Sequence, residues 1–163
     1  MKEAEQFIDY LKQHELRLST AESCTAGMII ALLADIPGSG SLMDCGYVVY
    51  SEQAKKRLLN VRQETIDKYT LTSEEVAREM ALGALHDSTA NAAIATTGIT
   101  GSEPMDGIAP GTICFAWGFQ TENGTRIFSE TKHFDGDRPT LRHVAACYAL
   151  QRFSHFHQQI KKN

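Results

Sequence analysis

The strongest constraint on this chain is its alternation of amphipathic helical segments with short β-rich runs. A helical pattern over Ala4–His14 leads into a strand-like run at 16–18, and a second helical pattern covers Cys24–Ala34 up to a Pro-Gly stop. A β-rich run at 46–50 then precedes a short helix at 51–59. Alternation of this kind predicts a layered α/β domain with helices on both faces of one sheet.

The second half of the chain continues this alternation and adds a hairpin. Residues 72–75 read as a capping box that opens a helix, and the apolar run at 92–96 reads as a buried strand. Two further β-rich runs, 112–119 and 126–134, flank an Asn-Gly turn and should be antiparallel neighbours. A last helix begins at 137–139, with proline in its first turn. We therefore predict a three-layer α/β/α sandwich with a mostly parallel or mixed central sheet and one late hairpin.

Length and composition predict a single domain over residues 1–163, with a tail that frays after about 155. The 163 residues are 42% hydrophobic and 22% charged, which is typical of a globular protein. No apolar run approaches the roughly 20 residues that span a bilayer, and the charged N-terminus has no signal-peptide pattern. We expect a cytoplasmic protein that does not associate with membranes.

Charge and metal-ligand spacing argue against several classes of partner. The net charge is −4 and the basic residues are scattered, so we expect no nucleic-acid binding. The cysteines form no C-x-x-C pair and read as free thiols, while the histidines lack metal-ligand spacing. We therefore expect neither a metal nor another cofactor. The cysteines are Cys24, Cys45, Cys114 and Cys147.

Candidate chemistry lies at the turns that follow Leu18, Val49 and Ala95, because ligands of such sheets bind beyond the carboxyl ends of the strands. The first of these turns leads into Thr20–Gly27, where hydroxyls crowd a strand-to-helix junction. Helix N–H groups there would favour a phosphate or an oxyanion. Plain helix capping by hydroxyl side chains explains the same pattern. Cys24 is a rival nucleophile, although a small buried cysteine is the commoner state.

The second turn brings a phenol, a hydroxyl and an amine together at Tyr50, Ser51 and Lys55. A lysine acts as a base for a serine if burial lowers its pKa, and a phenol can relay or orient the proton. A solvated lysine beside Lys56 and Arg57 is the alternative interpretation.

The third turn, Thr96–Gly101, places two glycines where backbone can approach a ligand closely. It contains neither a G-x-G-x-x-G nor a Walker pattern, and an ordinary loop is the alternative. Arg138 and Arg142, near the last helix, would bind phosphate bidentately unless they are plain surface charges.

These segments together resemble the CinA C-terminal domain family, which includes the nicotinamide-nucleotide amidases. The resemblance spans roughly Ala4 to Phe153 and rests on several motifs in the same order. The motifs are Thr20–Gly27, Gly46–Ser51 with Ala54-Lys55, Ser73–Leu85, Thr97-Gly98-Ile99, Gly111-Thr112 and Phe134–Arg138.

The resemblance implies an amidase that releases ammonia from nicotinamide mononucleotide and leaves nicotinic acid mononucleotide. It implies Ser23 as nucleophile, Lys55 as base, Tyr50 as a supporting residue, and a homo-oligomer. Ser23 would attack the carboxamide carbon, Lys55 would pass the proton to departing ammonia, and helix N–H groups would hold the oxyanion. The residues assigned to substrate binding are Thr25, Gly27, Ser51, Thr97, Gly98, Arg138 and Arg142.

Two departures from the family pattern motivate an alternative hypothesis about the function. The family loop usually reads TGIAGPGGG, whereas Thr97–Gly107 carries Glu103 and Asp106, whose charge would oppose a phosphate if they point inward. Ala26 also stands where many members have glycine. The alternative hypothesis is therefore a catalytically inactive or re-purposed paralogue that acts as a nucleotide-binding module.

Overall fold

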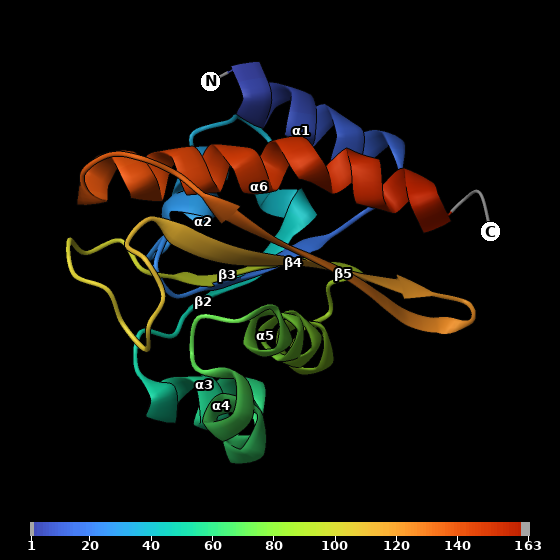
Figure 1. Cartoon of the computed structure of the whole chain (residues 1–163). Coiled ribbons are helices and arrows are strands. Elements are labelled where there is room, and N and C mark those ends of the chain that lie inside the picture. The colour runs from blue at the N-terminus through green and yellow to red at the C-terminus, as the bar shows by residue number, and fades with distance from the viewer. Residues whose placement is uncertain (1, 161–163) are drawn as a thin grey trace.

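The structure, a computed structural model that describes residues 2–160, is built on one five-stranded mixed sheet (Figure 1). The strands are β1 (Leu18–Glu22), β2 (Met43–Val48), β3 (Ala92–Gly98), β4 (Thr112–Thr121) and β5 (Gly124–His133). Their order in the sheet is β2-β1-β3-β4-β5. The strand pairs β1–β2 and β1–β3 are parallel, whereas β3–β4 and β4–β5 are antiparallel.

Helices cover both faces of this sheet and give the three layers that the alternation predicted (Figure 1). One face carries α1 (Lys2–Gln13), α2 (Met28–Ala34) and α6 (Arg138–Ile160), together with the 3₁₀ turn η1 (Ser39–Leu42). The other face carries α3 (Glu52–Leu59), α4 (Gln63–Tyr69) and α5 (Glu74–Asp87). The predicted α/β/α sandwich with a mixed sheet is therefore confirmed.

The strands direct large side chains to one face and small ones to the other. Trp117 and Phe119 on β4 are fully or almost fully buried under α6, and the Trp117 Nε1–H donates a hydrogen bond to the Ala149 carbonyl at 2.8 Å. On the opposite face, β3 presents Ala93 and Ala95 to the core under α5. Small side chains let α5 lie close to the sheet, because alternate residues of a strand face opposite layers.

The boundaries of β1 and of the second helix, α2, differ from the sequence prediction. β1 continues to Glu22, and α2 begins at Met28 rather than Cys24. The intervening residues form a turn in which Ala26 and Gly27 have φ angles of 54° and 84°. Left-handed backbone of this kind ends a strand sharply and excludes a regular helix there. The short helix α4 was not predicted, and no capping side chain marks its start.

The late hairpin is confirmed and the last helix is longer than expected. β4 and β5 pair up to the turn, where Thr121 lies opposite Gly124. α6 runs to Ile160 with Phe156 and His157 buried, so residues 156–160 belong to a regular helix. The remaining part of the expected tail, 161–163, lies outside the described residues.

Residues 2–160 contain neither a membrane-spanning helix nor a metal-binding cluster of side chains. No helix in that range is long and apolar enough to cross a membrane. No group of three or more His, Cys, Asp or Glu side chains in the same range is arranged to hold a metal ion.

The contact between α5 and the end of α3 predicts an unusual response to alanine. A Cβ on Gly83 would lie 2.1 Å from the backbone oxygen of Leu59. Alanine favours a helix over glycine by about 1 kcal/mol, yet forced overpacking costs about 1–3 kcal/mol. We expect Gly83→Ala to lower the free energy of unfolding, measured by urea denaturation, because a backbone atom has no rotamer to move to.

The matched control is Gly40→Ala, since a Cβ there meets nothing within 4 Å. It should change stability by less than about 0.5 kcal/mol. Equal stability of the two variants would refute the packing argument.

Candidate active site

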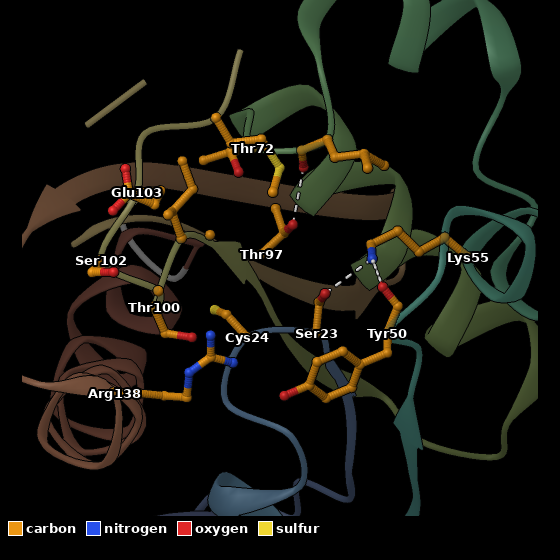
Figure 2. A pocket seen from close by; sticks show the side chains of 15 residues that line it. Ser23, Cys24, Tyr50, Lys55, Thr72, Thr97, Thr100, Ser102, Glu103 and Arg138 are labelled. Atoms are coloured by element: carbon orange, nitrogen blue, oxygen red, sulfur yellow. Dashed lines mark hydrogen bonds between the residues drawn. The ribbon is translucent and has the colours of Figure 1, made fainter. Parts of the chain in front are cut away.

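A cavity of about 450 Å³ lies at the carboxyl ends of the parallel strands. Its wall comes from the turn after β1, the segment after β2, the loop after β3, and the first residue of α6 (Figure 2). These are the turns at which sheet topology places ligands. Its lining includes Ser23, Cys24, Tyr50, Lys55, Thr72, Thr97, Gly98, Thr100, Glu103 and Arg138.

The centre of the cavity is a direct contact between a hydroxyl and an amine. Lys55 is only 2% exposed, and its Nζ lies 2.9 Å from the Ser23 Oγ. The same nitrogen donates to the Val49 carbonyl at 2.9 Å and to the Tyr50 carbonyl at 3.2 Å. The structure thus unites the two residues that were predicted as nucleophile and base, which lie on different elements of the sandwich.

Burial lowers the pKa of Lys55 below the ordinary value for lysine, because desolvation penalises its charged form. Carbonyl oxygens only accept hydrogen bonds, so Val49 and Tyr50 each take one N–H of the amine. In the neutral amine the lone pair is then left for the Ser23 hydroxyl, which donates to it. This is the geometry that a general base needs toward a serine nucleophile.

The turn that carries Ser23 is held by the buried carboxylate of Glu22. Glu22 is fully buried and accepts hydrogen bonds from the Thr25 hydroxyl at 2.7 Å, the Ile29 N–H at 3.1 Å and the Ile30 N–H at 3.2 Å. The expectation that N–H groups of this helix face an oxyanion is therefore wrong for these two donors. Their places are already taken by a protein carboxylate.

Cys24 is a poor candidate for the nucleophile. It is 5% exposed, and burial raises the pKa of its thiol to about 12. A thiol reacts as the thiolate, and at neutral pH almost none would be present. Among the candidates at this turn, Ser23 alone contacts the amine of Lys55.

Four further predicted residues line the cavity in different ways. Tyr50 is 58% exposed and contacts Lys55 through its carbonyl, while its hydroxyl points away from that amine (Figure 2). Thr97 donates its hydroxyl to the Leu71 carbonyl at 2.9 Å, and Gly98 adds backbone beside it. Arg138 is exposed on the opposite wall.

The other four predicted binding residues lie outside the lining, and each has a structural contact instead. The Thr25 hydroxyl bonds Glu22 and Thr96 in the interior. Ser51 caps α3 by accepting the Ala54 N–H at 3.0 Å, which is the commonest use of a serine before a helix. Gly27 supplies the left-handed residue that starts α2, and the Arg142 Nε–H donates to the Thr25 carbonyl at 3.3 Å.

Several lining residues had no signal in the sequence. Leu71 and Thr72 reach the cavity from the connection between α4 and α5, and no local pattern predicts that return. Thr100 belongs to the candidate turn Thr96–Gly101, but nothing in the sequence singled it out from the other residues of that turn. Glu22 was named only as part of the Thr20–Gly27 motif. An acidic residue at the end of a fully buried strand nevertheless indicates that its carboxylate has a specific hydrogen-bonding partner.

A profile described as the CinA C-terminal domain matches residues 1–157. The chain belongs to the CinA C-terminal domain family. Among its relatives in this family, a protein of Enterobacter agglomerans named nicotinamide-nucleotide amidohydrolase PncC is 41% identical over 82% of this chain and 80% of its own. A protein of the same name from Escherichia coli K12 is 39% identical over 93% of this chain and 90% of its own.

Solved structures of the CinA family agree with the fold. The competence damage-inducible protein A of Klebsiella pneumoniae superposes with a TM-score of 0.87 at 34% identity. The match covers 92% of this chain and 91% of that one. The sandwich and its connections are therefore the family's own.

The lowered pKa of Lys55 predicts a signature in the pH dependence of stability. Between that lowered pKa and the ordinary lysine value of 10.5, the unfolded chain holds a proton that the folded chain has released. Stability then rises with pH, because the unfolded state binds more protons. Lys55→Met removes this titration, so the unfolding free energy of wild type minus variant should increase across the window, as measured by urea denaturation at several pH values. A difference that stays constant would contradict the assignment.

Proposed function

We propose that this chain is a nicotinamide-nucleotide amidohydrolase, which converts nicotinamide mononucleotide and water into nicotinic acid mononucleotide and ammonia. The observation that carries the proposal is the 2.9 Å contact between the Lys55 Nζ and the Ser23 Oγ inside the cavity. Relatives named for this activity, 41% and 39% identical over most of their length, support it.

Ser23 and Lys55 carry the proposed reaction in two halves. The Ser23 Oγ attacks the carboxamide carbon while its proton moves to the Lys55 Nζ. Collapse of the tetrahedral intermediate breaks the C–N bond, and Lys55 returns the proton to the departing ammonia. Water then attacks the acyl-enzyme with Lys55 as base, the C–Oγ bond breaks, and the Ser23 hydroxyl is restored.

The oxyanion of each intermediate needs donors close to the nucleophile. The Ser23 N–H is taken by the Thr96 carbonyl at 3.0 Å, and the first free donors of α2 are taken by Glu22. In the described part of the chain, the N–H groups of Cys24 and Thr25 have no backbone acceptor. We assign the oxyanion to the Cys24 N–H, because Cys24 directly follows the nucleophile and lines the cavity, whereas Thr25 is fully buried outside the lining.

The charges around the cavity fit a substrate that carries both signs. The pyridinium ring of nicotinamide mononucleotide is cationic, and burial, which lowers the pKa of Lys55, favours the neutral amine that does not repel this ring. The exposed Tyr50 ring offers a wall to that cation. Arg138 offers a guanidinium to the phosphate.

An ammonia-release assay with nicotinamide mononucleotide tests the proposal. Wild type should release ammonia without added metal and in the presence of a chelator. Ser23→Ala and Lys55→Met should each lower kcat by about 10³-fold or more, because loss of either member of a nucleophile–base pair disables the chemical step.

Cys24→Ala is the matched control at the same turn and should have a mild effect. Activity that survives in Ser23→Ala would move the nucleophile elsewhere. A wild type inactive on a panel of pyridine nucleotides, yet able to bind them in calorimetry, would favour the binding-module alternative.

The proposal extends to setting and assembly. We propose that the protein is cytoplasmic and that residues 1–163 form a single domain. We also expect a homo-oligomer. The exposed edge of β2, where Val48 is 50% exposed, supports contact with a second copy. Light scattering at micromolar concentration should give a mass above that of one 18.0 kDa chain. A monomeric mass would reject the expected assembly.

A further inference from the structure

The cavity wall opposite Lys55 carries charged groups that the reaction steps above do not use. Figure 2 shows Arg138 and Glu103 on one side of the cavity and Lys55 on the other, with Ser23 between them. The Arg138 guanidinium lies against the loop backbone, with its Nη2 3.2 Å from where a Cβ on Gly101 would lie. Across residues 2–160, it makes neither a hydrogen bond nor an ion pair.

Thr100 is the second unusual group on this wall. It is only 8% exposed, lines the cavity, and its hydroxyl bonds nothing in the part of the chain that the structure describes. Buried hydroxyls are normally hydrogen-bonded, so one that faces a cavity is available to a ligand. Figure 2 shows this hydroxyl directed toward the Arg138 side chain.

The backbone holds Thr100 in this position. The neighbouring Ile99 N–H donates to the Thr112 carbonyl at 3.0 Å, and the Ile99 carbonyl accepts the Gly111 N–H at 2.8 Å. The loop is thus tied to the start of β4 immediately before Thr100. A side chain on backbone that is anchored in this way needs less ordering of the loop when it binds.

We propose that the Thr100 hydroxyl and the Arg138 guanidinium form the subsite for the substrate's phosphate monoester. A guanidinium offers paired N–H donors that match two phosphate oxygens, and the hydroxyl donates to the third. The inference rests on the proposed function, since it places the reacting amide at Ser23 and the phosphate at the far wall.

The subsite is built from side chains and not from the helix start beside it. The Asp137 carboxylate accepts the Thr140 N–H at 3.0 Å at the beginning of α6. That carboxylate already occupies the helix N-terminus, so a phosphate gains little there. Arg138 and Thr100 are therefore the donors that decide binding.

Glu103 limits the charge that this subsite accepts. It is exposed on the same wall, and no ion pair within residues 2–160 neutralises it. Its carboxylate repels a phosphate dianion through solvent, an effect that weakens as salt is added. Glu103→Gln should therefore raise kcat/KM for the mononucleotide by about two- to five-fold at low salt, and by less at high salt.

The experiment compares nicotinamide mononucleotide with nicotinamide riboside, which lacks only the phosphate. The measured quantity is the ratio of their kcat/KM values in wild type, Thr100→Val and Arg138→Met. Each variant should lower the ratio by about 10- to 100-fold, because each removes a hydrogen bond to a charged group. The matched controls are Thr89→Val and Arg126→Met, whose side chains are exposed away from the cavity and should leave the ratio unchanged.

The outcomes separate the subsite from the proposed function. Ammonia release with an unchanged ratio in both variants would overturn the subsite and leave the amidase assignment in place. If wild type releases no ammonia from either compound, the amidase proposal fails. Calorimetry with the mononucleotide then tests whether Thr100 and Arg138 bind the phosphate. Binding weakened by Arg138→Met and by Thr100→Val would support the subsite, and binding unaffected by both would overturn it.

Discussion

The contact between the Lys55 amine and the Ser23 hydroxyl is the interaction on which the rest of the site depends. A lysine that is 2% exposed loses most of its hydration, and two carbonyls compensate for part of that loss. The parallel pairing of β1 with β2 makes the arrangement possible. The Val49 N–H donates to the Glu22 carbonyl at 2.9 Å, so the residue before Ser23 is tied to the residue whose carbonyl accepts a hydrogen bond from Lys55.

Glu22 shows how a buried charge can be used to hold a turn in place. Its carboxylate has hydrogen bonds from one hydroxyl and two backbone N–H groups of the turn and helix that follow. The cost of burying an anion is offset by these donors and by the dipole of the helix start. The same contacts occupy those donors, which is why the oxyanion is assigned to the Cys24 N–H next to Ser23.

The layers of the fold were predictable because they follow from hydrophobic periodicity, whereas exact boundaries follow from local geometry that periodicity does not encode. The start of α2 was placed too early, since a hydroxyl-rich turn with left-handed residues looks like a capped helix. The site shows the same division. Strand-end topology indicated the turns that carry Ser23 and Lys55, and the family resemblance singled out these two residues. Neither separated Ser51, which caps a helix, from Thr100, which faces the cavity. Capping and ligand binding use the same hydroxyl chemistry, so only the three-dimensional placement distinguishes them.

Burial of Lys55 serves both halves of the proposed reaction. A lowered pKa raises the fraction of the amine that is neutral and able to accept the Ser23 proton. Once the amine is protonated, the same desolvation makes the ammonium a stronger acid than an exposed lysine, and this favours transfer of the proton to the leaving nitrogen. An exposed lysine would be held in its charged form at neutral pH and would fail at the first step. The depth of the amine below the cavity wall, fixed by α3 and two carbonyls, therefore makes a residue that is ordinarily a solvated cation suitable as an acid–base catalyst.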